Sequence, residues 1–256
     1  MPSCLALLLA AAAVAVTAPA DGASLQPAVQ LVAAAGADSG EGLGCSPFVH
    51  VDLYGEALCP FTMEFITKQI APLLPDSPFE RIIKFRYIAW GNALWNSTQG
   101  GMEPACQHGP DECRLNRVIN CAQRLRPAQA QWLPFVSCLA SKSRKKALGS
   151  VDMCAEGTAI EADALWRCVD GPDGDALESK AAEVTAALDP PHTYVPWVVV
   201  NGIPLGGLDS QLTRIVCIAF SGIKPKACYE PPPDAAAAAA LSAGGHTSAA
   251  APAGVA

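Results

Sequence analysis

The sequence predicts a mixed α/β sandwich with a helical region inserted in its middle. Three observations predict this class. Short apolar runs typical of strands alternate with segments whose apolar residues recur at helical spacing. The helical spacing continues longest in the middle of the chain, between the second and the third of these runs. With 256 residues, the chain is also long enough to bury a sizeable core.

The first strand is predicted over residues 49–54, where apolar and polar side chains alternate. A connection over 55–58 leads into a helix that opens at Cys59 and Pro60 and stops before Pro75. Pro60 suits the first helical position because its missing N–H costs no hydrogen bond there. Cys59 is therefore expected to cap the amino end of this helix.

The second strand is predicted over 82–90, and helices follow it. Their expected ranges are 111–125, 129–146, 158–169 and 174–188. A third strand over 194–200, the turn signal Asn201-Gly202 and a short fourth strand over 203–205 form a hairpin, and a helix over 208–221 closes the fold. This order predicts a thioredoxin-like sandwich with extra helices between the second and third strands.

Charge and cysteine content exclude some classes of function. The chain has 17 Lys and Arg against 24 Asp and Glu, with no basic block, so nucleic acid is not an expected partner. No central run reaches the ~18 apolar residues of a membrane span, so none is expected once the leader is removed. Eleven cysteines favour an oxidising compartment, where they form disulfides.

The amino end has the pattern of a secretory leader. A short apolar run over 5–16 is followed by an Ala-Pro-Ala pattern that a signal peptidase would cut after Ala20. We expect residues 1–20 to be a signal peptide; an uncleaved membrane anchor is the alternative. Asn96 begins an Asn-Ser-Thr sequon and is the expected glycosylation site. Together these features predict a lumenal or extracellular protein.

Composition divides the remainder of the chain. Residues 21–44 are rich in Ala, Gly and Ser and are expected to form a flexible lead-in. The folded domain is predicted over 45–230. Residues 231–256 form a low-complexity tail rich in Ala and Pro, for which a glycolipid-anchor signal is the alternative interpretation.

Cys59 is the predicted nucleophile. Free backbone N–H groups and the positive end of the helix dipole favour a thiolate at a helix amino end, and the thiolate is the reactive form. The alternative is that Cys59 is one more half-cystine. Thiol oxidoreductases commonly carry C-x-x-C at such a junction, but here Thr62 stands at the fourth position. A hydroxyl can hydrogen-bond a neighbouring thiolate, but it cannot resolve a mixed disulfide.

The head of the third strand is the second expected part of the site. Pro196 donates no ladder hydrogen bond, so its place at the strand start suggests a turn and plausibly a cis bond after Val195. A trans proline at a sheet edge is the alternative. In a thioredoxin-like sheet this loop lies beside Cys59, where the Val195 backbone is expected to pair with an extended substrate. Pro60 and Phe61, which follow Cys59, are the other expected substrate contacts.

A long cysteine signature covers residues 106–121. Its sequence, CQHGPDECRLNRVINC, fits the pattern C-Q-H-G-x-x-E-C-x-x-N-x-x-x-x-C and resembles the signature of the gamma-interferon-inducible lysosomal thiol reductase (GILT) family. Residues 53–59, 90–93 and 190–198 also resemble family segments in the same order. The likeness extends over 48–229.

The resemblance implies a thioredoxin-like fold with an inserted helical region, in a soluble glycoprotein that is secreted or lies in a lysosomal or vacuolar lumen. It implies reduction of protein disulfides at acidic pH. The family's reductases carry C-x-x-C, and Thr62 replaces the second cysteine here. We therefore expect a monothiol oxidoreductase that uses Cys59, Thr62 and Pro196, needs no cofactor, and relies on glutathione, cysteine or a substrate thiol. The alternatives are a non-catalytic binding protein stapled by disulfides, and a structural domain with every cysteine paired.

Eight cysteines are expected to form four disulfides whose connectivity the sequence leaves open. They are Cys106, Cys113, Cys121, Cys138, Cys154, Cys168, Cys217 and Cys228. Cys113 and Cys121 lie roughly 12 Å apart along one predicted helix, too far to pair with each other. Zinc held by Cys106, His108, Cys113 and Cys121 is the disfavoured alternative, so no metal is expected.

Three further residues have weaker signals. His108 is expected to be a packed or capping residue rather than a base, because nothing in the sequence places it near Cys59. Asp52 is expected to be a solvated carboxylate rather than a proton relay. Cys45 and Cys59 stand at opposite ends of a strand roughly 20 Å long, so they are not expected to pair.

Overall fold

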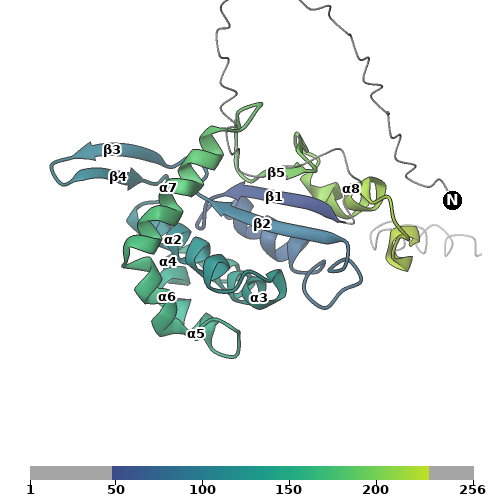
Figure 1. The fold of residues 1–256 in the computed structure, drawn as a ribbon, viewed down its shortest axis with the longest axis horizontal. Coiled ribbons are helices and arrows are strands. Elements are labelled where there is room, and N and C mark those ends of the chain that lie inside the picture. Colours follow the sequence, from purple (N-terminus) through teal and green to yellow (C-terminus); the bar gives the residue numbers. More distant parts are fainter. Residues whose placement is uncertain (1–47, 231–256) are drawn as a thin grey trace, which may run out of the picture. The chain divides into compact units, whose positions relative to one another are not determined.

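A four-stranded sheet forms the centre of the molecule in the computed structural model, which describes residues 48–230 (Figure 1). Its strands lie in the order β2-β1-β5-β6, with β1 parallel to β2 and the other pairs antiparallel. Their bounds are Val49–Gly55 for β1, Ile83–Ala89 for β2, Trp197–Val200 for β5 and Ile203–Pro204 for β6. The predicted leader, lead-in, tail and Cys45 lie outside the described residues.

Successive side chains of these strands point to opposite faces of the sheet. Val51 and Leu53 of β1 and Phe85 of β2 belong to the larger hydrophobic core. Tyr54 and Ile88 belong to a second cluster, which also contains Ala181 and Ala182. The alternation in β1 therefore reflects burial of one face in the larger core, and the other face is exposed at His50 and becomes buried at Tyr54.

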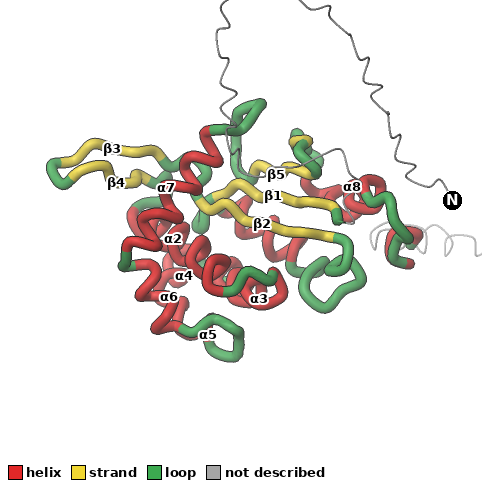
Figure 2. Tube along the Cα trace, viewed as in Figure 1, coloured by secondary structure: helices red, strands yellow, loops and turns green. Residues whose placement is uncertain are grey.

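Helices make up most of the rest (Figure 2). Their bounds are Pro60–Phe65 for α1, Pro110–Leu125 for α2, Gln129–Ala140 for α3, Arg144–Ala147 for α4, Val151–Ala155 for α5, Ala162–Val169 for α6, Pro172–Ala186 for α7 and Leu212–Ala219 for α8. A π-helical turn, Ile66–Ile70, continues α1. Helices α2 to α7 form the predicted insertion between the second strand and the third predicted strand, β5. No helix in the described range is long and apolar enough to cross a membrane.

Four disulfides staple this arrangement. Two join helices of the insertion: Cys121 of α2 with Cys168 of α6, and Cys138 of α3 with Cys154 of α5. The others are Cys106–Cys113, just before and within α2, and Cys217–Cys228 beside α8. These cysteines therefore offer no thiolates to zinc. Cys113 and Cys121 each bond to a different partner, as the helical spacing requires.

Several element ends differ from the expected ones. The helix predicted over 129–146 breaks after α3, where the Ser141 hydroxyl donates a hydrogen bond to the Cys138 carbonyl oxygen at 2.6 Å. The helix predicted from 158 begins at Ala162, because Thr158 Oγ1 accepts the Ile160 N–H and holds a turn there. The third predicted strand begins at Trp197, directly after Pro196, which has no N–H to donate.

A hairpin that the sequence did not predict is formed by β3, Leu94–Thr98, and β4, Gly101–Ala105. It extends from the main body, as Figure 1 shows. Every residue of β3 is exposed, so no apolar alternation indicates a strand. Trp95 contacts Trp90 with ring centroids 4.9 Å apart, which ties the hairpin to the sheet end. Asn96 is exposed on β3.

Candidate active site

Cys59 lies at the amino end of α1 and is the only free cysteine among residues 48–230. Its backbone carbonyl accepts the Met63 N–H at 2.9 Å, the first hydrogen bond of the helix. Its side chain is 5% exposed, and Sγ lies 3.9 Å from the Val195 carbonyl oxygen. The Val195–Pro196 peptide bond is cis. The structure thus brings together Cys59, the predicted nucleophile, and the loop that was expected beside it.

Thr62 lies on the inner side of α1, completely buried. Its hydroxyl oxygen has no hydrogen-bond partner within the described part of the chain. The hydrogen bond to Cys59 of which a hydroxyl at this position is capable is therefore not formed. Thr62 packs against the backbone of Gly55 instead, where an added Cβ would lie 2.8 Å from Thr62 Cγ2. This close contact explains why a glycine suits the end of β1.

An open groove of about 510 Å³ runs along the outer side of α1. Phe61, Val195 and Pro196 line it together with Phe65 and Tyr194. Phe61 is 69% exposed, which is unusual for a phenylalanine and typical of a binding surface. Of the expected substrate contacts, only Pro60 is absent from the lining; it is exposed at the start of α1.

The other wall of the groove carries a carboxylate. Asp209 begins a 3-10 turn, Asp209–Gln211, and burial raises the pKa of its carboxyl above the ordinary value. One of its oxygens is buried without a hydrogen-bond donor among the described residues. The Asp209 charge also raises the pKa of Tyr194, after the larger effect of burial, and both residues line the groove.

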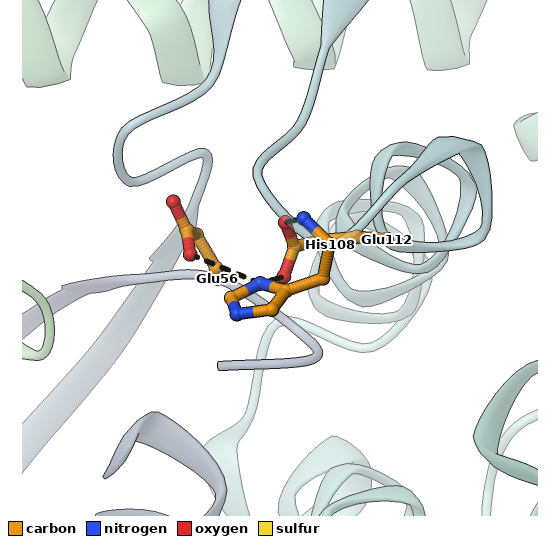
Figure 3. A group of neighbouring side chains, drawn as sticks. All are labelled: Glu56, His108 and Glu112. Carbon is orange, nitrogen blue, oxygen red and sulfur yellow. Dashed lines mark hydrogen bonds and ion pairs between the residues drawn. The ribbon is translucent and has the colours of Figure 1, made fainter. Parts of the chain in front are cut away.

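A cluster of three titratable side chains lies behind the loop that leads to Cys59: Glu56, His108 and Glu112 (Figure 3). His108 Nδ1 lies 2.5 Å from Glu112 Oε2 and 3.4 Å from Glu56 Oε2. Both glutamates are completely buried, and the Leu58 N–H donates to Glu112 Oε2 at 3.2 Å. His108 is half-buried and paired with Glu112, in keeping with the expected packed residue. Glu112 in turn contacts Leu58, the residue before Cys59, a proximity that nothing in the sequence indicated.

Burial and charge repulsion shape this cluster. Burial raises the pKa of the Glu56 carboxyl, and the neighbouring charge of Glu112 raises it further. Burial also raises the pKa of the Tyr87 phenol well above its ordinary value, with smaller contributions from the charges of Glu112, Cys59 and Glu56. The charges of the two glutamates and of Cys59 therefore act on the same buried residue, Tyr87.

Glu56, His108 and Glu112 are also a set that can ligate a divalent cation, with ligand atoms within 4.8 Å of one another. His108 Nδ1 already pairs with Glu112 Oε2. The His108 backbone N–H donates to Glu112, and the Asn92 backbone N–H donates to Glu56. We assign no metal to them.

Asp52 lies away from this cluster. It forms a two-bond ion pair with Arg86 of β2, its neighbour across the parallel strands, at 2.8 and 2.9 Å. The carboxylate is therefore held at the solvent-facing side of the sheet rather than between Cys59 and a proton donor. This placement agrees with the solvated interpretation.

Glu56 and Glu112 were not predicted from the sequence to lie near Cys59. One signal could have found Glu112: it stands four residues before Asn116 on one helix, so both polar side chains share a face. A charged residue and an amide that share a face with apolar neighbours on α2 indicate buried partners.

Known proteins resemble this chain in sequence over most of its length. The family model described as "Gamma interferon inducible lysosomal thiol reductase (GILT)" matches residues 50–158. Gamma-interferon-inducible lysosomal thiol reductase of Mus musculus is 36% identical over 186 residues, which cover 72% of this chain and 73% of that protein. Its counterpart in Carassius auratus is 34% identical over 189 residues, covering 70% and 72%. The gamma-interferon-responsive lysosomal thiol protein of Arabidopsis thaliana is 32% identical over 190 residues, covering 72% and 77%.

A solved structure resembles the fold. Oxidised BdbD from Bacillus subtilis matches with a TM-score of 0.51 at 15% identity, covering 69% of this chain and 89% of that one. At this identity the match shows a shared fold alone, and it confirms the thioredoxin-like sandwich. From the sequence relatives, the chain belongs to the gamma-interferon-inducible lysosomal thiol reductase family and with it to the thiol-disulfide oxidoreductases.

Proposed function

We propose that this protein reduces or rearranges protein disulfides by a monothiol route in which Cys59 is the nucleophile. One observation carries the proposal: among residues 48–230, Cys59 is the one thiol outside a disulfide, and it stands at the start of α1 beside the Val195 carbonyl. A thiol at the junction between a strand and the amino end of a helix is in the environment typical of a reactive thiol. Membership of a thiol reductase family adds to this support.

The proposed chemistry has two exchanges. The Cys59 thiolate attacks one sulfur of a substrate disulfide, a Cys59 mixed disulfide forms, and the other substrate sulfur leaves as a thiolate. An external thiol, such as glutathione or cysteine, then attacks Cys59 Sγ and releases the substrate thiol. A second external thiol frees Cys59, so two small thiols become one small disulfide. Alternatively, a substrate thiol attacks the mixed disulfide and the substrate disulfide is rearranged without net reduction.

Thr62 is the reason for proposing an external thiol. It stands where a resolving cysteine of a C-x-x-C pair would stand, and the other eight cysteines between residues 48 and 230 are in disulfides. The pair Cys106–Cys113 joins the segment before α2 to the first turn of that helix. The mixed disulfide is therefore expected to persist until a thiol arrives from solution.

The groove supports a polypeptide substrate. Its apolar residues Phe61, Phe65, Tyr194 and Pro196 can bury side chains that flank the attacked cysteine. Val195 joins the groove to the sulfur, because its carbonyl is the atom next to Sγ and its residue lines the groove. An extended segment lying along Val195 would bring its disulfide to Cys59.

The compartment follows from the same features. Four disulfides persist in an oxidising lumen, and the exposed Asn96 sequon is open to glycosylation there. We propose that the protein works in the secretory pathway, in a lysosomal or vacuolar lumen or after secretion.

Trapping of the mixed disulfide tests the proposal. Purified protein is incubated at pH 5 and at pH 7 with a peptide disulfide and no other thiol, and intact mass is measured. One peptide half should add to the wild type and map to Cys59. The Cys59→Ser variant should gain no mass. Failure of the wild type to form an adduct at either pH would contradict the proposal.

One observation favours a second candidate, a binding protein that keeps the groove and has no turnover. Cys59 is almost completely buried, and the hydroxyl of Thr62 forms no hydrogen bond that would stabilise its thiolate. The two candidates separate when glutathione is added to the trapped adduct. Release of reduced peptide in repeated cycles supports the oxidoreductase, whereas tight peptide binding without an adduct supports the binding protein.

A further inference from the structure

One face of α2 carries a row of polar side chains at helical spacing: Glu112, Asn116, Asn120 and Gln123. Glu112 is completely buried, and Asn116 and Asn120 are 1% and 9% exposed. Buried polar groups need partners, and each of these four finds one in the backbone of another element.

The last two residues of the row, Asn120 and Gln123, bond to the backbone at the edge of the sheet. β2 is an edge strand in the order β2-β1-β5-β6, so one side of its backbone has no neighbouring strand. Asn120 bonds both the N–H and the carbonyl of Ala89, at 3.3 and 3.0 Å. Gln123 does the same at Tyr87, at 3.0 and 2.6 Å. Side chains of α2 thus satisfy the groups that a further strand would satisfy.

The near end of the row holds a different segment, the connection between β1 and α1. Asn116 Oδ1 accepts the Ala57 N–H at 2.9 Å, and Glu112 Oε2 accepts the Leu58 N–H at 3.2 Å. These are the two residues before Cys59. Glu112 and Asn116 are also the glutamate and the asparagine of the cysteine signature.

Glu112 is itself held from the opposite side. Its Oε1 accepts the His108 backbone N–H at 3.0 Å, and its Oε2 faces His108 Nδ1 (Figure 3). The Cys106–Cys113 disulfide closes the segment that carries His108 onto the first turns of α2. Hydrogen bonds to a buried carboxylate are stronger than neutral ones, so this acceptor is fixed in place before it meets Leu58.

We infer that Glu112, oriented by His108, is a positioning residue for Cys59: its carboxylate fixes the backbone at Leu58 and so sets where Sγ lies against Val195. The inference rests on the proposed function of Cys59 as the nucleophile. Sulfur exchange needs the attacking sulfur in line with the substrate disulfide, and misplacement by about 1 Å can cost up to about 100-fold in rate. The signature residues thus act on the reaction without contacting the substrate.

Three variants test the inference: Glu112→Ala, Glu112→Gln and His108→Ala. Adduct formation with a peptide disulfide is measured over a range of peptide concentrations, which separates the maximal rate from peptide binding. Glu112→Ala should lower the maximal rate about tenfold or more and leave peptide binding unchanged, because the groove is untouched. Glu112→Gln should restore most of the rate, since its side-chain oxygen can still accept the Leu58 N–H. His108→Ala should fall between them, and it tests the same inference if Glu112→Ala does not fold.

Gln123→Ala is the matched control, because it breaks the same kind of backbone contact at Tyr87 instead of at Leu58. It should cost thermal stability and leave the maximal rate within about twofold. Hydrogen exchange of the Leu58 amide gives a readout independent of sulfur chemistry: exchange should be slow in the wild type, faster by about tenfold in Glu112→Ala, and slow again in Glu112→Gln.

Equal rates for Glu112→Ala and Gln123→Ala, or no rescue by Glu112→Gln, would overturn the inference. A wild type that forms no adduct would defeat the proposed function. In that case, the Leu58 exchange rates would still show whether Glu112 holds this backbone. Unchanged exchange in Glu112→Ala would refute the inference alone.

Discussion

The two sides of Cys59 differ in chemistry. On the inner side, buried polar groups of α2 bond to the backbone of Ala57 and Leu58. On the outer side, the exposed ring of Phe61 and the buried residues Val195 and Pro196 line an open groove. The inner side is held by hydrogen bonds and is closed to solvent, while the outer side opens to solvent along the groove. We infer that the first determines where the sulfur lies and the second determines what reaches it.

Among the changes that test this comparison, replacing the Cys59 sulfur should have the largest effect on turnover. The Cys59→Ser variant keeps both sides of the site and removes the nucleophile. Turnover of a denatured disulfide substrate should fall to the level of the small thiol alone, because a hydroxyl does not carry out sulfur exchange under these conditions. Turnover is measured with glutathione near pH 5 and pH 7. Substantial remaining turnover would mean that another thiol is the nucleophile.

Adding a thiol on the inner side should give the next largest effect. Thr62→Cys places a second sulfur at the third helical residue after Cys59, on the buried side of α1. The variant should lose the long-lived peptide adduct and gain turnover with a dithiol reductant by about tenfold or more, because the new thiol can resolve the mixed disulfide. Thr62→Ser is the control and should behave like the wild type. Equal turnover by wild type and Thr62→Cys would show that a resolving thiol already exists in the chain.

Changes on the outer side should be smaller and should act on binding. Phe61→Ala removes an exposed ring from the groove and should weaken peptide binding by about 1 kcal/mol, roughly fivefold, without changing the maximal adduct rate. Ile223→Ala, at a residue 98% exposed that is not in the groove lining, is the control and should change neither quantity. A change in the maximal rate for Phe61→Ala would show that the two sides are not independent.

The smallest predicted effect concerns the protonation of Glu56, a buried glutamate on the inner side of Cys59, and its contribution to stability. The folded protein raises the pKa of Glu56, so the native state binds this proton more tightly than the unfolded chain. Glu56 thus favours folding less as pH rises from the ordinary carboxyl pKa through the raised one. Relative to Glu56→Gln, which stays neutral, the wild type should lose melting temperature between about pH 4.5 and pH 7.

Melting curves of both proteins across this range check the sign. Glu103→Gln is the matched control, because Glu103 is exposed on β4 and should give a curve parallel to that of the wild type. Parallel curves for wild type and Glu56→Gln would contradict the expected burial of this charge.

Local patterns in the sequence predicted one half of the site. The strand over 49–54, the helix start at Cys59 and the Val195-Pro196 bond each depend on a few adjacent residues, and the structure shows all three. The sheet then brings Cys59 and Val195 together, as expected for a thioredoxin-like order of elements.

The other half could not be predicted in the same way. Leu58 and Glu112 are 54 positions apart, and the contact depends on how α2 crosses the edge of β2. Disulfide connectivity has the same origin, because Cys121 meets Cys168 only after two helices pack together. The hairpin of β3 and β4 was not predicted for another reason: its exposed strands have no buried face that would produce an alternating pattern in the sequence.

The most direct test of the central claim is single-turnover mass spectrometry of the wild type with a peptide disulfide, followed by addition of glutathione. We predict that one peptide half adds to Cys59, persists while no thiol is present, and leaves as reduced peptide when glutathione is added. Release of the adduct without an added thiol, or a protein that never gains the peptide mass, would contradict the monothiol account.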